Sequence, residues 1–479
     1  MQHLIAALVL AAGPLAAADA IDSYVKEEMA ASHIPGLSLA VVHRGRTIKT
    51  GVYGLADVEL DAPVRPQTRF AIASMTKSFT AAAVLLLEED GKLRLDDPIG
   101  RYLGPLPESW KAITVHHLLT HTSGIKDHFS DFPFYPPLPA LSSMNRRLEF
   151  KDEEIVKALS EAPLNFVPGE RYAYSGSGYV LLGQIIRKVT GRPYVALLQE
   201  RIFRPLGMND TRLIDLAEII PNRASGYSLN GSALRNGGYT GQTFSSAADV
   251  AMLTTATDLA RWFEAVASDP VWKRILGRMA TPGALSDGGP LAIPFGGSHG
   301  LGWHLSTYKG EPADGHNGSF ITGFTSAMVH LPRRELSVIV LTNQHAANPT
   351  RIAYTIAGLV DPALRPPHLM TAQTDAAPDR TRRVDRLVRR LLRGEGDNSV
   401  DVVPFLRTRL AGYPAPPPDE APPIAVSFIT GEDVSQRAIE LNGHRIAHMS
   451  HYKVVIGDEP VWLTFYFDAD GLIADYGGY

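Results

Sequence analysis

The chain has 479 residues, of which 45% are hydrophobic and 20% are charged; this predicts more than one domain and an ordinary globular composition. A formal net charge of -4 gives no reason to expect nucleic acid or an anionic membrane as a partner. The chain has no cysteine, which excludes disulfides, thiolate metal sites, iron–sulfur clusters, a cysteine nucleophile and a lipidated N-terminal cysteine.

The first residues have the pattern of a secretory signal peptide. An apolar run over Leu4–Leu15 is followed by small residues, and positions 16–20 offer two small-x-small cleavage sites. Gln2 and His3 supply no fixed positive charge ahead of this run, and a buried N-terminal helix is the alternative. We expect residues 1–18 to be a signal peptide and the protein to be exported to a bacterial periplasm or secreted. No later segment has the roughly 18 uninterrupted apolar residues of a membrane-spanning helix.

Two short apolar runs open the main part of the chain. Leu37–His43 and Thr47–Tyr53 flank the turn Arg44-Gly45-Arg46 and predict a β-hairpin. A helical pattern follows over Ser74–Asp90, and Gly91 supplies the left-handed C-cap that ends a helix.

Strand patterns return only late in the chain. Residues 110–270 carry mostly helix and loop signals, whereas Phe324–Leu331 and Leu336–Thr342 alternate around a Pro-Arg-Arg turn and predict a second hairpin. Strands at both ends with helices between them predict one sheet assembled from distant segments, with a helical insert beside it. We therefore expect an α+β domain over residues 19–362.

The composition changes near residue 361. A segment rich in Pro, Ala and Thr predicts a linker over residues 363–378. In the helix expected next, Val384, Leu387 and Val388 mark one face, and seven arginines lie between positions 380 and 393. We favour a solvated face on a docked helix over a membrane or nucleic-acid contact.

The end of the chain alternates like an antiparallel meander. A proline-rich spacer, Pro414–Pro423, precedes it. Residues 379–479 are therefore expected to form a small α+β domain, whose strands are predicted over Ile424–Ile429, Gln436–Leu441, Ile446–Ile456 and Trp462–Phe467.

Two familiar catalytic patterns lack their context. Gly296-Gly297-Ser298-His299-Gly300 fits the nucleophile elbow G-x-S-x-G, but that elbow needs a strand before it and a helix after it. A proline interrupts the preceding segment and a strand pattern follows, so we interpret this stretch as a glycine loop. His117 and His121 lie four apart without the glutamate of H-E-x-x-H, and we interpret them as structural.

The pattern S-x-x-K is informative at one position. It also occurs at Ser23, Ser123, Ser306 and Ser450, but Ser74-Met75-Thr76-Lys77 opens a helix after an apolar approach. A serine at a helix start lies where free N–H groups favour developing negative charge, and a lysine one turn on can reach its hydroxyl. By itself this pattern is equally compatible with an N-capping serine and a solvated lysine.

Five ordered segments complete the pattern. The chain resembles the serine β-lactamase-related superfamily: class C β-lactamases, D-alanyl-D-alanine carboxypeptidases and family VIII carboxylesterases. The resemblance covers about residues 20–360 and implies an antiparallel sheet flanked by helices, with a helical subdomain as the second wall of a cleft. The segments that carry it are Phe70-Ala-Ile-Ala-Ser-Met-Thr-Lys77, His117-Leu-Leu-Thr-His-Thr-Ser-Gly124, Pro168-Gly-Glu-Arg-Tyr-Ala-Tyr-Ser175, Thr257-Asp-Leu-Ala-Arg261 and Gly315-His-Asn-Gly318.

The resemblance implies a role for each matching residue. Ser74 is expected to be the acylated nucleophile and Lys77 its electrostatic activator. Tyr174 matches the tyrosine of the family's Tyr-x-Asn motif and is expected to act as general base and then general acid. From the residues alone, Tyr174 is one aromatic side chain among several in its segment.

The last segment, His316-Asn317-Gly318, resembles the family's Lys-Thr-Gly or His-x-Gly element at the sheet edge. Gly318 is expected to let substrate approach the backbone. The N–H groups of Ser319 and Ser74 are expected to form the oxyanion hole. Without the motif, His316 reads as a surface histidine.

One position departs from the family. The third residue of Tyr-x-Asn is Gly176, so the amide that helps relatives hold the acylamide of β-lactams and peptides is absent. Gly176 therefore favours esters, whose alkoxide leaves more readily than an amine. The aromatic loop over residues 129–139 is equally compatible with the lining of an apolar acyl pocket and with the core of the subdomain.

We expect an exported serine hydrolase that acts on a small-molecule ester or amide, or on a peptide, with no metal and no cofactor. Esterase activity is the first expectation. D-amino-acid peptidase, amidase or weak β-lactamase activity is the enzymatic alternative. A penicillin-recognising sensor or scaffold that is acylated without turnover is the non-enzymatic one.

Overall fold

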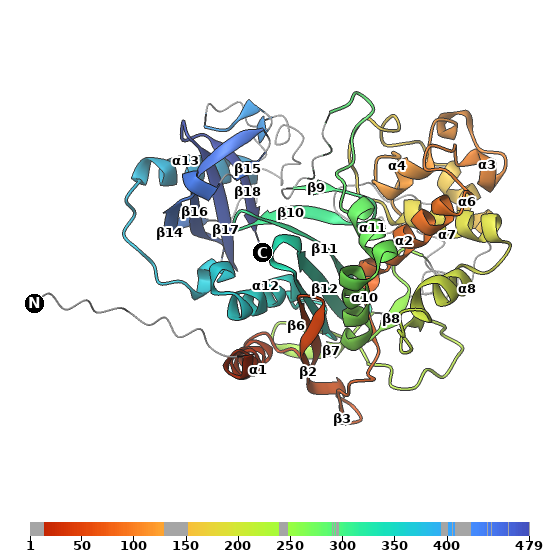
Figure 1. The fold of residues 1–479 in the computed structure, drawn as a ribbon, viewed down its shortest axis with the longest axis horizontal. Helices are drawn as coiled ribbons and strands as arrows, with labels where there is room; N and C mark the ends of the chain where they lie inside the picture. The colour runs from red at the N-terminus through yellow and green to blue at the C-terminus, as the bar shows by residue number, and fades with distance from the viewer. Residues whose placement is uncertain are drawn as a thin grey trace, which may run out of the picture.

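The computed structural model describes residues 14–128, 152–238, 248–289, 291, 293, 297–393, 401–404, 406–407, 423–437, 439–441, 443–457 and 459–478. Antiparallel sheets and separate groups of helices confirm the expected α+β class (Figure 1). Three parts are visible: a central sheet, a helical region on one side of it, and a C-terminal module on the other.

The central sheet has eight strands in the order β3-β2-β1-β13-β12-β11-β10-β9. It joins the two predicted hairpins, because β1 pairs with β13 in an antiparallel register that places Leu39 opposite Val340. Chain segments about 300 residues apart thus form neighbouring strands, as the sequence pattern predicts. The strands are β1 (Gly36–His43), β2 (Arg46–Asp57), β3 (Ala62–Pro63), β9 (Ser298–His299), β10 (His304–Tyr308), β11 (Glu311–Phe320), β12 (Phe324–Leu331) and β13 (Leu336–Thr342).

The central strands of this sheet are buried on both faces, which explains their nearly continuous apolar runs. In β1, Ala40 and Val42 belong to the core shared with the helical region, whereas Leu39 and Val41 belong to a second core. Successive side chains of a strand point to opposite faces. The second core is covered by α1 (Pro14–Ala31) and α12 (Pro349–Val360), and α10 (Ala256–Ser268) packs on the other face.

The helical region surrounds one central helix. In α2 (Thr76–Glu89) every residue from Thr76 to Leu87 is buried, as expected for a helix that is apolar or small all round. It packs against α7, α8 and α11. The remaining helices are α3 (Gly100–Leu103), α4 (Val115–Leu119), α6 (Asp152–Ser160), α7 (Gly176–Thr190), α8 (Tyr194–Leu198) and α11 (Pro270–Met279), with 3-10 or π turns η1 (Ala73–Met75), η2 (Glu108–Trp110) and η3 (Gln199–Phe203).

A small three-stranded sheet, β4-β8-β5, supports the start of α2. Its strands are β4 (Phe70–Ala71), β5 (Arg212–Leu213) and β8 (Met252–Thr254), and a separate hairpin pairs β6 (Tyr227–Asn230) with β7 (Ala233–Asn236). Because β4 pairs with β8 directly before Ser74, β8 fixes the chain that leads into the predicted nucleophile.

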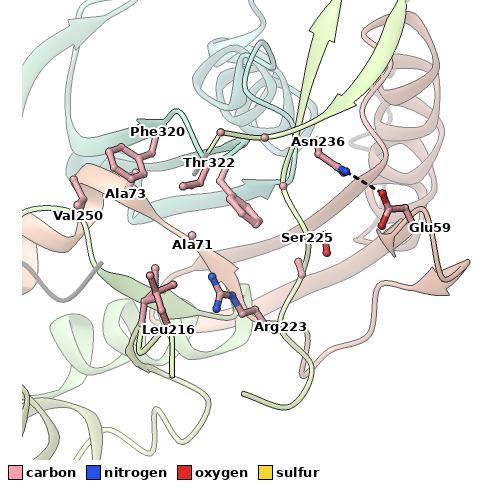
Figure 2. A pocket seen from close by; sticks show the side chains of 16 residues that line it. Glu59, Ala71, Ala73, Leu216, Arg223, Ser225, Asn236, Val250, Phe320 and Thr322 are labelled. Atoms are coloured by element: carbon pink, nitrogen blue, oxygen red, sulfur yellow. Dashed lines mark hydrogen bonds between the residues drawn. The ribbon is translucent and has the colours of Figure 1, made fainter. Parts of the chain in front are cut away.

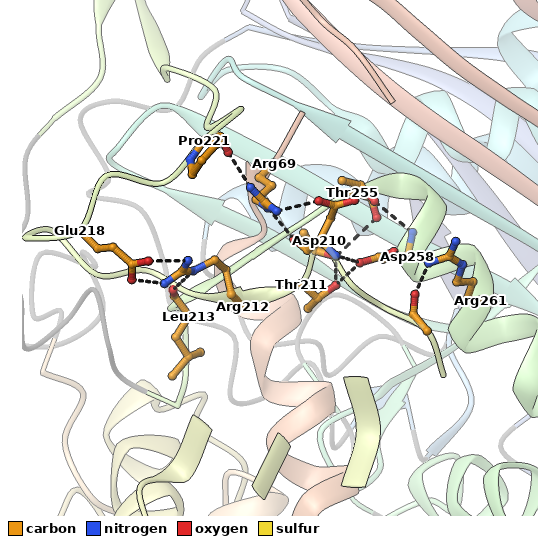
Figure 3. Close-up of polar contacts among 12 residues, drawn as sticks. Arg69, Asp210, Thr211, Arg212, Leu213, Glu218, Pro221, Thr255, Asp258 and Arg261 are labelled. Atoms are coloured by element: carbon orange, nitrogen blue, oxygen red, sulfur yellow. Dashed lines mark hydrogen bonds and ion pairs between the residues drawn. The ribbon is translucent and has the colours of Figure 1, made fainter. Parts of the chain in front are cut away.

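The Thr-Asp-Leu-Ala-Arg motif anchors this small sheet through a polar network (Figure 3). The Asp258 carboxylate accepts hydrogen bonds from the Asp210 N–H and the Thr211 hydroxyl, both at 2.8 Å, and from Arg261 at 3.1 Å. Arg69 donates to the Asp210 carboxylate at 2.7 Å. The motif thus joins α10 to the segments on either side of β8, and its role in this fold is structural.

The C-terminal module has its own core. Its sheet has the order β14-β16-β17-β18, with β15 paired to β16, and α13 (Pro378–Leu392) buries Val384, Leu387 and Val388 against it. The strands are β14 (Ile424–Asp433), β15 (Glu440–Leu441), β16 (His444–Ile456), β17 (Glu459–Asp468) and β18 (Ile473–Gly478).

Two strand predictions in this module differ from the structure. The strand expected over Gln436–Leu441 is wrong at its start, because Ser435–Arg437 forms a 3-10 turn, and Glu440–Leu441 pairs with β16. The sequence pattern also omitted β18, whose Gly477 and Gly478 interrupt the apolar alternation. Two 3-10 turns, Pro362–Leu364 and Pro367–Leu369, lie at the start of the predicted linker.

The turn between β10 and β11 contacts the module. A side chain on Gly310 would meet Ile439 at 2.3 Å, and the Tyr466 hydroxyl donates to the Thr307 carbonyl at 3.3 Å. Lys309 lies 4.0 Å from Glu432 across the same contact. The two parts thus touch but do not share a core.

Part of the expected signal peptide, residues 1–13, lies outside the described residues. The predicted cleavage sites fall in the first turns of α1, ahead of Ile21, which is buried in the second core. In the described part of the chain, none of the helices combines the length and the apolar character that crossing a bilayer requires.

Removal of residues 370–479 is expected to leave a folded main domain, because the module has a separate core. Far-UV circular dichroism should retain the helical signal, and calorimetry should show one cooperative transition at a modestly lower temperature than in the full chain. An insoluble or molten product would instead show that the module completes the fold of the main domain.

Candidate active site

Ser74 is the one residue of its segment that reaches the surface. Every other residue from Phe70 to Leu87 is buried, and Ser74 is partly exposed. It lies in the 3-10 turn η1 directly before α2, after Ala73, whose φ of 47° is a sparsely populated conformation for a residue with a side chain. The Ile72 N–H donates to the Met252 carbonyl at 3.0 Å and holds the turn against β8. The fold therefore presents one hydroxyl from an otherwise buried segment.

Lys77 is buried beneath this hydroxyl. The residue is only 1% exposed. Its ammonium donates to Ser74 Oγ at 3.2 Å and to the Asp249 carbonyl at 3.0 Å. Burial alone would lower the pKa of Lys77, but Tyr174 and the carboxylates of Asp249 and Asp127 outweigh it and raise that pKa above its ordinary value. Lys77 thus stays positively charged and stabilises negative charge nearby.

Tyr174 also lies close to the ammonium of Lys77. The Lys77 ammonium is 5.0 Å from the centre of the Tyr174 ring and forms a hydrogen bond with this side chain. His121 stacks on the ring at a centroid distance of 4.3 Å, and its Nδ1 accepts the Ser175 N–H at 3.0 Å. The structure therefore brings Ser74, Lys77 and Tyr174 together, and it gives His121 the structural role that the sequence predicts.

Asp249 is a site residue that sequence analysis did not identify. Its carboxylate is fully buried near Lys77, and His128 Nε2 lies 3.7 Å from it. Burial raises the pKa of Asp249, and the positive charge of Lys77 opposes that shift. No motif marks this position, and 172 residues separate it from Lys77, so only the folded chain identifies it.

The expected substrate-binding strand is β11. The neighbouring β10 pairs with β11 only as far as Gly315, and η1 packs against β11 beyond that point. His316 is buried, whereas Ser319 is exposed. This arrangement places Ser319 and Ser74 on adjacent segments, as an oxyanion hole formed by their N–H groups requires.

Gly318 is needed for a reason that the sequence analysis did not foresee. A side chain there would lie 2.1 Å from the Ile72 carbonyl and 2.7 Å from Ser326 Oγ. Gly318 thus permits close packing of β11 on the turn that carries Ser74, and its expected role in substrate access stays a prediction.

His316 is a neutral group in this setting. Burial lowers its pKa well below the ordinary value, and His304 and Lys77 lower it further. Its Nδ1 lies 2.6 Å from the Asn317 carbonyl. Where the family's alternative motif has a lysine, this site therefore has an uncharged imidazole at neutral pH.

Gly176 is the first residue of α7, and its N–H donates to the Asp127 carboxylate at 3.0 Å. Helical residues have a negative φ, so this position does not need the conformational freedom of glycine. The absence of the family's asparagine thus changes the side-chain chemistry of the site without a demand from the backbone.

The two catalytic patterns that lack their sequence context, around Ser298 and His117, have structural explanations. Ser298 lies on the short strand β9, donates to the Leu291 carbonyl at 2.5 Å and precedes another strand instead of a helix. His117 forms a capping box with Thr114 at the start of α4. The aromatic loop over residues 129–139 lies outside the described residues.

The contact between Gly318 and Ile72 leads to a prediction about reactivity. Gly318→Ala should displace η1, because the new methyl group overlaps the Ile72 carbonyl. Labelling of Ser74 by a fluorophosphonate probe should slow by about a hundredfold, the usual effect of misplacing a reactive group by 1 Å. Gly277→Ala is the matched control, because that helical glycine has open space around it. Equal labelling rates in the two variants would show that the contact does not position Ser74.

Two solved structures share this fold. The octameric penicillin-binding protein homologue from Pyrococcus abyssi has a TM-score of 0.62 and 24% sequence identity, and the match covers 94% of this chain and 96% of that chain. The D-alanine carboxypeptidase AmpC from Burkholderia cenocepacia has a TM-score of 0.57 and 22% identity, over 71% of this chain and 98% of that chain.

Curated relatives match the main domain. Protein flp of Staphylococcus aureus (strain MW2) is 27% identical over 328 residues, which are 67% of this chain and 62% of that protein. Penicillin-binding protein 4* of Bacillus subtilis (strain 168) is 29% identical over 308 residues, which are 61% of this chain and 64% of that protein. The chain thus spans less than two thirds of the length of either relative.

A family model described as Beta-lactamase matches residues 21–363. Because that match covers more than half of the chain and agrees with the five ordered motifs, the chain belongs to the Beta-lactamase family.

Proposed function

We propose that the protein is a serine hydrolase that cleaves esters through an acyl-enzyme on Ser74. The observation that carries the proposal is the pairing of Ser74 Oγ, the only exposed group of its segment, with a buried ammonium at 3.2 Å. A hydroxyl is a weak nucleophile until a neighbouring group takes its proton or stabilises its anion. We assign stabilisation of the anion to Lys77, which donates to Ser74 Oγ, and acceptance of the proton to Tyr174 beside it.

The proposed reaction follows from the charge on Lys77. The ammonium of Lys77, whose pKa is raised, stabilises the negative charge that develops on the attacking group. In the proposed reaction Tyr174 accepts the proton of Ser74 as Ser74 Oγ attacks the ester carbonyl, and then returns the proton to the departing alkoxide. The N–H groups of Ser74 and Ser319 stabilise the oxyanion. Water then attacks the acyl-enzyme. Tyr174 accepts a proton from this water and returns it to Ser74 Oγ, which releases the acid.

Two features of the site support an ester over a β-lactam or a D-alanyl peptide. Such peptides and β-lactams carry a carboxylate, and the buried, neutral His316 provides no positive charge for it. Gly176 provides no side-chain amide for an acylamide group. An ester needs neither interaction, and its leaving group departs more readily.

A pocket of about 390 Å³ adjoins the nucleophile turn and fits the non-reacting part of a substrate (Figure 2). Its wall includes Ala73, the residue before Ser74, and it also contains Arg223. Most of the other side chains on its wall are apolar, among them Leu216, Val250 and Phe320. This lining suits an apolar acyl or alcohol group.

The serine hydrolase proposal is tested by substitution of the two competing serines. Ser74→Ala should reduce kcat for a short p-nitrophenyl ester by a thousandfold or more, the order expected when an activated nucleophile is lost. Ser298→Ala should leave kcat nearly unchanged, because the Ser298 hydroxyl donates to the Leu291 carbonyl and the proposal gives it no part in the reaction. Mass spectrometry should find the acyl group on Ser74.

Three results would contradict the proposal. Labelling of Ser298, or of neither serine, would remove the assigned nucleophile. A burst of one equivalent without turnover would identify the acylatable sensor or scaffold. Faster turnover of D-alanyl peptides or nitrocefin than of esters would identify the peptidase or β-lactamase alternative.

The substrate preference is tested at Gly176. Gly176→Asn should raise kcat/KM for nitrocefin relative to the p-nitrophenyl ester by about five- to tenfold, because one new hydrogen bond contributes about 1 kcal/mol. Gly178→Ala, in the same helix and with only ordinary contacts, controls for a change in helix stability. An unchanged ratio would show that the missing asparagine does not determine the preference.

A further inference from the structure

Three neighbouring strands at one edge of the central sheet each bring a histidine to the same place. His299 on β9 is the direct cross-strand partner of His304 on β10, and His304 also pairs with Gly315, the residue before His316 on β11. The centroid of the His304 ring lies 4.9 Å from that of the His299 ring and 4.5 Å from that of the His316 ring. We refer to His299, His304 and His316 as the histidine triad.

Hydrogen bonding defines the tautomer of two members of the triad. Each of these two histidines has a free ring nitrogen that can bind a metal. Nδ1 of His299 lies 2.8 Å from the Gly300 carbonyl, and Nδ1 of His316 lies 2.6 Å from the Asn317 carbonyl. A carbonyl oxygen only accepts, so Nδ1 carries the hydrogen and Nε2 has the lone pair. Both Nε2 atoms are buried and have no hydrogen-bond partner within the described part of the chain. A backbone carbonyl on Nδ1 and a free Nε2 is the usual arrangement of a metal-binding histidine.

The spacing of the triad fits a small cation. One ring nitrogen from each histidine can be chosen so that all three lie within 4.8 Å of one another. Tetrahedral zinc with Zn–N distances of about 2.0–2.1 Å needs nitrogens roughly 3.3 Å apart, so the three rings must approach one another when the ion binds. Three imidazoles suit zinc and neighbouring transition metals, and they leave at least one coordination position open.

We propose that the histidine triad binds a divalent transition metal ion, with zinc as the first choice. The site goes beyond the proposed esterase function and does not depend on it. A bound dication would place at His316 the positive charge that the imidazole lacks, so the argument for esters drawn from a neutral His316 applies to the metal-free protein. The nearby Lys77 ammonium opposes that charge, so the affinity will be lower than in a site without a neighbouring cation.

His121 offers a control within the same cluster. Its ring lies 4.8 Å from that of His299, and its Nε2 is buried without a partner among the described residues. Its Nδ1, however, accepts the Ser175 N–H, so Nε2 carries the hydrogen and has no lone pair for a metal. His121→Asn should therefore retain metal binding.

The experiment uses the untagged full chain, freed of metal with a chelator and then titrated with Zn²⁺ by calorimetry. One ion should bind per chain, and Co²⁺ should bind in its place with the intense visible absorption of a tetrahedral nitrogen site. His304→Phe should weaken Zn²⁺ binding by about a hundredfold or more, since even the loss of a group that only supports a ligand costs roughly 10- to 100-fold.

A second variant and the folded state of each protein keep the result interpretable. His299→Leu should also lose the site, and thermal unfolding without metal should show that the variants are folded. Added Zn²⁺ should raise the unfolding temperature of wild type and His121→Asn, but not of His304→Phe. No zinc binding by wild type, or binding as tight as that of wild type in both triad variants, would overturn the proposal. The same titration on Ser74→Ala separates this outcome from any failure of the esterase proposal.

Discussion

The buried ammonium of Lys77 is the constraint on which the site depends. Moving an ammonium from water into a protein interior costs several kcal/mol unless polar groups replace its hydration. Here Ser74 Oγ, the Asp249 carbonyl and the Tyr174 side chain surround it. These groups come from three distant segments, so the charge is tolerated only when all three segments are packed in place.

The turn that carries Ser74 is held from both sides. On one side β8 pairs with β4 and accepts the Ile72 N–H, and the Asp258 network anchors β8 to α10. On the other side Gly318 lets β11 approach the Ile72 carbonyl closely. The positive φ of Ala73 persists because this packing over-determines the turn. The small sheet and the central sheet thus each hold one side of the turn that carries Ser74.

The electrostatics of the site separate a charged side from a neutral side. Lys77, Asp249 and Asp127 form the charged side behind the nucleophile, whereas burial keeps the histidines at the sheet edge neutral. The neutral side is consistent with an ester substrate that carries no carboxylate. It also leaves imidazole nitrogens without partners, which is the basis of the metal site that we propose. The two inferences therefore concern the same histidines in two states, because the ester argument applies to the metal-free triad and a bound ion would add positive charge.

The sequence by itself determined the features that depend on nearby residues. Ser74 and Lys77 are one helical turn apart, so their spacing alone brings them together once α2 forms. The hairpins of the main sheet follow from alternation and turn residues, and the order of five motifs was enough to identify the family and its α+β fold. Tyr174 was identified through its motif, because no local pattern relates it to Lys77.

Only the tertiary structure decided the features that arise between distant segments. Asp249 contacts Lys77 from 172 residues away, and the triad exists because the β9–β10 register places His299 opposite His304. The packing reason for Gly318 and the omitted strand β18 have the same origin. Strand register and close backbone approach are set by the packing of whole segments, to which periodicity and residue type along a single strand contribute little.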